Sequence, residues 1–291
     1  MRRDSGPAIA AGAAYGAKRD GNPVMLALAA DHVVADKAAF VAACREAADA
    51  ARQGRIVTFG VKPDRPATEY GYIRPGAATG GSGVFAVDRF VEKPDAATAE
   101  RYVAEGCLWN SGNFVFVAGD LLAEYAAFEA DTVAAAKAAI AAAGSDLGFI
   151  TIDPGSFARA KATSIDYAVM EKTKRAAVIP VAYGWSDVGS WHAVWELSPH
   201  DEAGNAAQGN AVFVDTQNSF AASEKPLVAL FGPVSASAQT SRTTIQPVTI
   251  PGGKPLDAAT AASRPQFQER TSVTKHTARI GGQTGGQTGH L

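Results

Sequence analysis

Short apolar runs alternate with helix-forming segments through much of this 291-residue chain, and this alternation limits the fold more than any other feature. The runs at 24–30, 56–61 and 177–181 are continuous rather than alternating in polarity, which is typical of strands buried on both faces. Segments with helical periodicity, such as 40–52 and 131–143, lie between them. The sequence therefore predicts an α/β fold built on a mixed, mostly parallel sheet.

The composition excludes several classes of function. Hydrophobic residues make up 47% of the chain, and 27 basic residues nearly balance 29 acidic ones, so no net field attracts nucleic acid or an anionic membrane. No apolar run approaches the ~20 residues of a membrane-spanning helix. Cys44 and Cys107 have neither disulfide nor metal-site spacing. We expect a cytoplasmic protein without a nucleic-acid or membrane partner, and the sequence leaves open whether it forms a homo-oligomer.

A carboxylate flanked by glycines and tryptophans lies in the stretch Gly-Trp-Ser-Asp-Val-Gly-Ser-Trp at 184–191. Glycine lets backbone approach a ligand closely, and an indole covers a large flat surface while donating one hydrogen bond. Asp187 is therefore a candidate ligand for a metal or a polar group. Alternatively, Asp187 serves a tight turn and caps the helix that follows, because Asp and Gly favour turns as readily as binding sites.

A second carboxylate, Asp31, follows the apolar run 24–30 directly. Ligands of open α/β sheets bind beyond the carboxyl ends of the strands. Magnesium is commonly held there by one or two carboxylates together with phosphate oxygens and water. Asp31 and Asp187 are thus the two candidate metal ligands.

Three further motifs carry groups that suit a phosphorylated sugar. Glu92-Lys93 places an acceptor and a cation side by side after a predicted strand, for a sugar hydroxyl and a phosphate. Asn110 begins an Asn-Ser-Gly turn that offers an amide and a hydroxyl, and Gly71 lies between two tyrosines where backbone amides can face a ligand. Each motif, taken alone, also fits a surface turn or a bend at a strand edge.

The order of these motifs resembles the bacterial mannose-1-phosphate guanylyltransferases, a branch of the sugar-phosphate nucleotidyltransferases. The resemblance runs from about residue 5 to about 232. It rests on six segments: ADH at 30–32, EYGYI at 69–73, FVEKP at 90–94, LWNSG at 108–112, SIDYAVMEK at 164–172 and GWSDVGSW at 184–191. It implies a Rossmann-like nucleotidyltransferase sheet followed by a short β-rich segment.

The resemblance implies transfer of GMP from GTP to mannose 1-phosphate, which gives pyrophosphate and GDP-mannose for polysaccharide biosynthesis. Such an in-line attack needs positioning and charge neutralisation rather than covalent catalysis. The implied roles fall on polar residues of the six segments: Asp31 and Asp187 for Mg²⁺, Lys93 for the sugar phosphate, and Gly71, Glu92 and Asn110 for the sugar. By the same comparison, Asp166, Glu171 and Lys172 order the helix beside the site rather than touch substrate.

Both ends of the chain depart from the family pattern. The family opens with a strand and a GxGxRLWPLSR loop that cradles the triphosphate, whereas residues 2–9 here resemble its later RNTAPAI segment. We therefore expect the first β-α-β portion to be missing and activity to be impaired, because losing one stabiliser of transition-state charge commonly costs ~10²–10³ in rate. Residues 242–254 faintly resemble the start of a cupin-like isomerase domain without its His-rich run, so no isomerase activity is expected.

The expected organisation is a truncated nucleotidyltransferase domain at 1–205, a short β-helix-like segment at 206–250 and a divergent, disordered tail at 251–291. An alternative to an enzyme is a non-catalytic remnant that binds the sugar phosphate but not GTP. A glycosyltransferase with a related sheet is disfavoured, since no D-x-D triplet follows an apolar strand.

Overall fold

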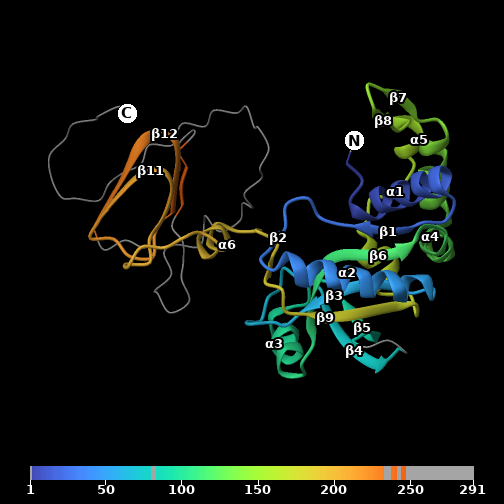
Figure 1. Ribbon diagram of the computed structural model, residues 1–291, viewed down its shortest axis with the longest axis horizontal. Coiled ribbons are helices and arrows are strands. Elements are labelled where there is room, and N and C mark those ends of the chain that lie inside the picture. Colours follow the sequence, from blue (N-terminus) through green and yellow to red (C-terminus); the bar gives the residue numbers. More distant parts are fainter. Residues whose placement is uncertain (1, 80–82, 233–236, 241–243, 247–291) are drawn as a thin grey trace. The chain divides into compact units, whose positions relative to one another are not determined.

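The computed structural model describes residues 2–79, 83–232, 237–240 and 244–246 (Figure 1). It divides into two compact units, Met1–Trp185 and Ser186–Leu291, which are described here one at a time. The three-segment organisation proposed from the sequence stays a prediction, and its tail at 251–291 lies outside the described residues.

The first unit is built on a six-stranded sheet in the order β1-β6-β3-β9-β5-β4, with an additional pairing between β6 and β4. Its strands are β1 (Val24–Ala27), β3 (Ile56–Val61), β4 (Tyr72–Ala78), β5 (Phe85–Val91), β6 (Leu108–Val117) and β9 (Ala176–Val181). Because β6 pairs with β1, β3 and β4, it borders more of the sheet than any other described strand.

The α/β class and the mixed sheet are confirmed, but the expectation of a mostly parallel sheet is not. Among the described strands of this sheet, only β3 and β9 pair in parallel. The other pairs are antiparallel: β1 with β6, β3 with β6, β4 with β5, β4 with β6 and β5 with β9. A continuous apolar run reports burial on both faces of a strand and carries no information on its direction.

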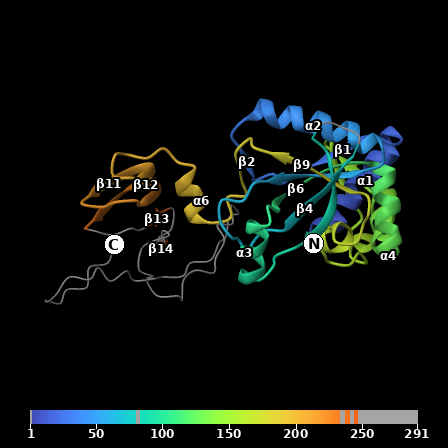
Figure 2. The same ribbon diagram turned by 90° about the horizontal axis from the view of Figure 1, so that it is seen from below.

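Helices cover both faces of this sheet (Figure 2). Successive residues of β3 pack into different cores on those two faces. Ile56 packs in a core with α1 (Ser5–Asp20) and α4 (Ala118–Ala141), whereas Val57 packs with α2 (Lys37–Arg52). The remaining elements of this unit are α3 (Ala96–Ala104), α5 (Pro154–Phe157), the π-helix η1 (Asp166–Met170), the hairpin of β7 (Gly144–Asp146) and β8 (Phe149–Thr151), and β2 (Val33–Val34). The two-residue strand β10 (Trp185–Ser186) lies where the two units divide. β3 and β9 are thus mostly buried between two helical layers, as their apolar runs predict. The run 24–30 was expected to be buried on both faces, but β1 has no buried residue and Leu26 is 41% exposed.

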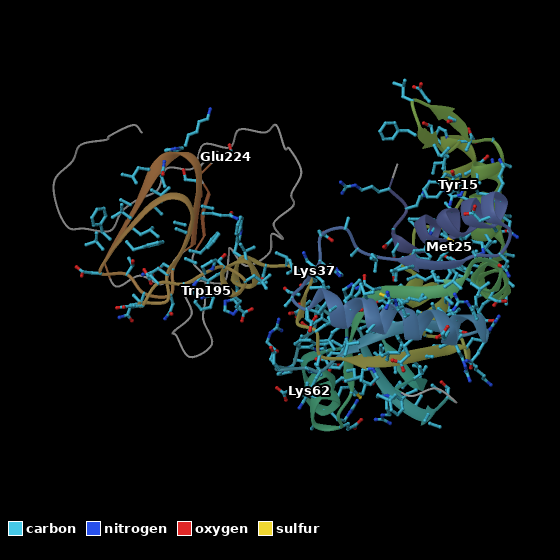
Figure 3. All side chains as sticks on the ribbon, viewed as in Figure 1. Tyr15, Met25, Lys37, Lys62, Trp195 and Glu224 are labelled. Carbon is cyan, nitrogen blue, oxygen red and sulfur yellow. The ribbon has the colours of Figure 1, made fainter. Side chains whose placement is uncertain are left out.

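The second unit begins with α6 (Trp191–Glu196), followed by β11 (Ala206–Val214), β12 (Phe220–Phe231), β13 (Ser237–Thr240) and β14 (Thr244–Gln246). β12 pairs in parallel with both β11 and β13, and β14 is antiparallel to β13. Trp195 packs against a small core around Phe220, and its Nε1 donates to Gly204 O at 2.8 Å (Figure 3). The short β-rich segment expected after the nucleotidyltransferase sheet is confirmed. No helix in the described part of the chain is long and apolar enough to cross a membrane.

Candidate functional site

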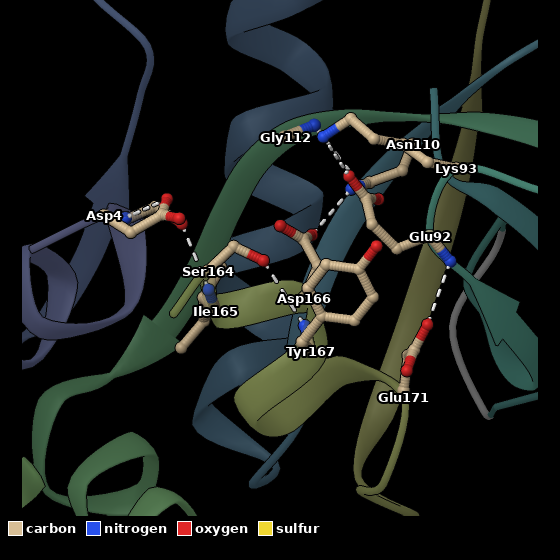
Figure 4. A network of polar contacts seen from close by, with 11 residues as sticks. Asp4, Glu92, Lys93, Asn110, Gly112, Ser164, Ile165, Asp166, Tyr167 and Glu171 are labelled. Carbon is tan, nitrogen blue, oxygen red and sulfur yellow. Dashed lines mark hydrogen bonds and ion pairs between the residues drawn. The ribbon is translucent and has the colours of Figure 1, made fainter. Parts of the chain in front are cut away.

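Asn110 lies at the centre of a buried hydrogen-bond network in the first unit (Figure 4). Its backbone N donates to Gly71 O at 2.8 Å. Its side-chain Oδ1 accepts from Thr58 Oγ1 at 2.8 Å and from Gly112 N at 3.3 Å. Its Nδ2 donates to Asp166 Oδ1 at 2.9 Å. With only 7% of Asn110 exposed, these contacts fix the orientation of the carboxamide.

The strand pairing explains why Asn110 can be buried. Asn110 lies opposite Gly60 of β3, where a register shift between Thr58 and Gly60 marks a bulge. The neighbouring residue, Trp109, lies opposite Tyr72 of β4. A buried amide costs free energy unless it is hydrogen-bonded, and β3, β6 itself and η1 supply its partners. Asn110, near the start of β6, is therefore a polar residue that can be buried within the sheet.

Glu92 and Lys93 follow β5 and form an ion pair, with Lys93 Nζ 2.9 Å from Glu92 Oε1. The Glu92 side chain is 8% exposed, whereas that of Lys93 is 48% exposed. Glu92 N also donates to Glu171 Oε1 at 3.0 Å. Lys93 adopts φ +49°, in the left-handed region that residues with a side chain rarely occupy. Backbone strain of this kind is concentrated at binding and active sites.

Gly71 provides the space in which the Glu92 carboxylate lies. A Cβ atom built on Gly71 would collide with Glu92 Oε2 and lie 3.3 Å from Asn110 Cβ. Only glycine leaves that space open. The structure thus brings together Gly71, Glu92 and Asn110, with Lys93 attached through its ion pair. These are four of the six residues expected to form the site.

Asp166 has a closer relation to this group than the sequence suggested. Beyond ordering its helix, it accepts the hydrogen bond from Asn110 Nδ2. Burial, and after it the negative charge of Glu92, raise the pKa of Asp166 to about 7. Sequence reasoning also missed Thr58, the partner of Asn110 Oδ1. Both residues carry the same signal, a lone polar residue within an apolar run, which requires a buried partner.

The two expected metal ligands lie in different units. Asp31 is exposed and follows β1 in the first unit. Asp187 belongs to the second unit, where its Oδ1 accepts from Gly189 N at 3.1 Å. It does not cap α6, because Ser190 fills that role by accepting from Ala193 N at 3.1 Å. That Asp31 and Asp187 share a metal ion stays a prediction.

The described residues contain no group of three or more His, Cys, Asp or Glu side chains that could hold a metal ion. A magnesium site formed by one or two carboxylates does not need such a group, since phosphate oxygens and water complete the coordination. The carboxylates of Asp31 and Asp187 are hard oxygen donors of the kind that Mg²⁺ prefers, so the chemistry of the donor set fits this ion.

The network brings together the amide of Asn110, the shielded carboxylate of Glu92 and the half-exposed side chain of Lys93. Carboxylate and amide oxygens accept hydrogen bonds from hydroxyl groups, and an amide N–H can donate one. A lysine ammonium pairs with phosphate as a point charge. The arrangement therefore suits a ligand that carries both hydroxyl groups and a phosphate.

Comparison with known proteins defines the class. The model of the nucleotidyl transferase family matches residues 1–204, and the chain belongs to this family. Within it, the chain is 46% identical over 237 residues to mannose-1-phosphate guanylyltransferase of Escherichia coli K12, covering 79% of this chain and 49% of the relative. It is also 46% identical over 231 residues to the xanthan biosynthesis protein XanB of Xanthomonas campestris pv. campestris B100, with the same coverage. The chain thus spans about half the length of these curated relatives.

A solved structure agrees with the family assignment. The crystal structure described as mannose-1-phosphate geranyltransferase from Thermus thermophilus matches with a TM-score of 0.75 and 31% identity. The match covers 85% of this chain and 72% of the other. The fold expected from the motif order, a nucleotidyltransferase sheet, is therefore confirmed.

Proposed function

We propose that this chain carries the sugar-phosphate site of a mannose-1-phosphate guanylyltransferase, which transfers GMP from GTP to mannose 1-phosphate and releases pyrophosphate. One observation carries the proposal: Gly71, Glu92 and Asn110, distant in sequence, adjoin one another in a single network. Relatives 46% identical over 79% of the chain include a protein named for this activity, which supports the same conclusion.

The roles of the residues follow from their chemistry. Lys93, whose ammonium is half-exposed, pairs with the phosphate of the sugar. The carboxylate of Glu92 accepts a hydrogen bond from one sugar hydroxyl. Asn110 Oδ1 already accepts two hydrogen bonds, so its Nδ2 group donates to another hydroxyl oxygen. Held at both ends, the sugar phosphate keeps one phosphate oxygen directed at the α-phosphorus of GTP. Such positioning can lower a barrier by ~7–11 kcal/mol in well-oriented systems.

Asp31 and Asp187 would hold Mg²⁺ in this proposal. When bound, the ion neutralises charge on the triphosphate and so favours attack by a second anion. A cytoplasmic location belongs to the same proposal, because Cys44 and Cys107 are both unpaired, as in a reducing compartment.

The test is formation of GDP-mannose from GTP and mannose 1-phosphate with Mg²⁺, followed by chromatography and mass spectrometry. We expect a low rate of product formation with the wild-type chain, and a further loss of at least about tenfold in rate for Asp31→Asn and for Asp187→Asn. Asp49→Asn, an exposed carboxylate on α2, is the matched control and should keep the wild-type rate. Binding of mannose 1-phosphate without binding of GTP and without product would replace the proposal with the sugar-phosphate-binding remnant. Binding of neither ligand would contradict both.

A further inference from the structure

The Asn110 carboxamide has only one orientation that satisfies its neighbours. Oδ1 accepts from two donors, the Thr58 hydroxyl and the Gly112 amide, so the Nδ2 group must face the other way. There it donates one N–H to Asp166 Oδ1 at 2.9 Å. The Nδ2 group has a second N–H, whose direction is set by the first. The three hydrogen bonds together fix the plane of the carboxamide and hence the direction of this second N–H, and Asp166 supplies the contact on the Nδ2 side (Figure 4).

Asp166 and Glu92 are two carboxyl groups beside a single ammonium, that of Lys93. Glu92 and Lys93, in the segment after β5, are the charged groups that act on Asp166. Two of its other neighbours are neutral: Asn110 of β6, and Ser164, which precedes Asp166 in the chain. Glu171, at the end of η1, has its Oε1 on the backbone N of Glu92. Burial makes it costly to charge the Asp166 carboxyl, and the nearby negative charge of Glu92 adds to that cost. Both effects raise the pKa of Asp166, so its neutral form persists to a higher pH than that of an ordinary carboxyl group.

We propose that Asp166 is a positioning residue of the sugar-phosphate site, which aims the second N–H of Asn110 at the bound sugar and does so while its own carboxyl is neutral. This inference rests on the proposed function, since it names a regulator of the same site. Neutral Asp166 adds no negative charge beside the ion pair of Lys93 and Glu92, so the Lys93 ammonium keeps more of its positive field for an incoming phosphate. Ionised Asp166 adds a second negative charge, which competes for Lys93 and repels the anionic ligand.

The predicted effect of pH is on the affinity for mannose 1-phosphate. Because the pKa of Asp166 is raised to about 7, the group is neutral at pH 6 and mostly ionised at pH 8. The affinity for mannose 1-phosphate should fall as pH rises through this range. The second ionisation of the ligand phosphate occurs in the same range and must be separated from the effect of Asp166.

The substitution Asp166→Asn makes this separation. It keeps an oxygen acceptor for Asn110 Nδ2 and cannot ionise, whereas the ligand titrates identically with both proteins. Calorimetry of the whole chain at pH 6 and pH 8 should show that wild type weakens by about fivefold to tenfold relative to Asp166→Asn. Asp49→Asn is the matched control and should follow wild type. Asp166→Ala should bind about tenfold more weakly than Asp166→Asn at pH 6, because it removes the acceptor.

The outcomes separate this inference from the proposed function. A difference between wild type and Asp166→Asn that grows with pH supports both. Equal affinities of the two proteins at both pH values overturn the inference alone. Failure of the wild-type chain to bind mannose 1-phosphate at either pH overturns the proposed function and the inference together. If Asp166→Ala fails to fold, Asp166→Asn still decides, with its thermal unfolding measured first.

Discussion

At the scale of single residues, the position of the Glu92 carboxylate depends on Gly71, which has no side chain to occupy the same space. Its position beside the Glu92 carboxylate and the Asn110 Cβ leaves no room for a methyl group. Glu92 is shielded from solvent and tied to Lys93, so it cannot move aside without disturbing the ion pair. Adding one carbon atom at Gly71 should therefore displace both Glu92 and Lys93, the two side chains that form the ion pair.

The substitution Gly71→Ala should raise the dissociation constant for mannose 1-phosphate by at least about tenfold, because the added Cβ displaces Glu92. Overpacking of this kind also destabilises a fold by ~1–3 kcal/mol. Gly12→Ala is the matched control, since a Cβ on Gly12 of α1 meets nothing within 4 Å. In a helix that change should stabilise by ~0.5–1 kcal/mol and leave binding unchanged. Equal binding by Gly71→Ala and wild type would disprove the assigned role of Gly71.

The residues of the site divide into those that the sequence could reveal and those that it could not. The Tyr-Gly-Tyr, Glu-Lys-Pro and Asn-Ser-Gly motifs expose Gly71, Glu92 and Asn110, because each combines chemistry with turn-forming residues. Thr58 lies in an apolar run without such a motif, and Asp166 lies in the SIDYAVMEK segment at 164–172, which indicated a helix beside the site but not a contact with Asn110. Their role depends on a pairing between distant segments, 52 and 56 residues from Asn110, which one sequence does not contain.

Among the secondary-structure elements, β6 and its neighbour β3 determine where the site lies. The bulge in β3 between Thr58 and Gly60 sets Thr58 against Asn110. Gly60 faces the sheet's core, where a Cβ would lie 2.6 Å from Leu108 Cδ1 and 2.8 Å from Val178 Cγ2. Both neighbours are themselves buried. The junction of β3, β6 and β9 is therefore packed around the absence of a side chain.

The substitution Gly60→Ala should destabilise the chain by ~1–3 kcal/mol, because well-packed cores resist added carbon atoms. Urea unfolding followed by circular dichroism measures this as a lower midpoint with an unchanged slope. Gly12→Ala again serves as the control in the opposite direction. An unchanged midpoint for Gly60→Ala would contradict the claim that Gly60 is tightly packed against Leu108 and Val178.

Sequence patterns predicted the position of the elements better than their direction or helical type. The helix expected at 131–143 forms the second part of α4, which begins at Ala118 and contains one non-helical residue, Glu129. The helix expected at 164–172 forms as the π-helix η1, with Ser164 Oγ accepting from Tyr167 N at 3.4 Å. Strand direction was missed because β4 and β5 form an antiparallel pair within a pattern typical of parallel sheets. Direction depends on long-range pairing, which periodicity does not report.

The molecule as a whole separates the two halves of the predicted chemistry between its units. The first unit contains the sugar-phosphate network and Asp31, and the second contains Asp187. Family membership rests on residues 1–204, which include both carboxylates. The proposed function therefore depends first on whether the network in the first unit recognises a sugar phosphate.

Calorimetric titration of the whole wild-type chain and of Asn110→Ala with mannose 1-phosphate at pH 6 tests that claim most directly. Asn110→Ala removes the amide and leaves Thr58 and Asp166 in place, and thermal unfolding of both proteins checks that the variant is folded. The account predicts saturable binding by wild type and at least about tenfold weaker binding by folded Asn110→Ala, the loss typical of a hydrogen bond in a buried site. Equal affinities of the two proteins, or no binding by wild type, would contradict it.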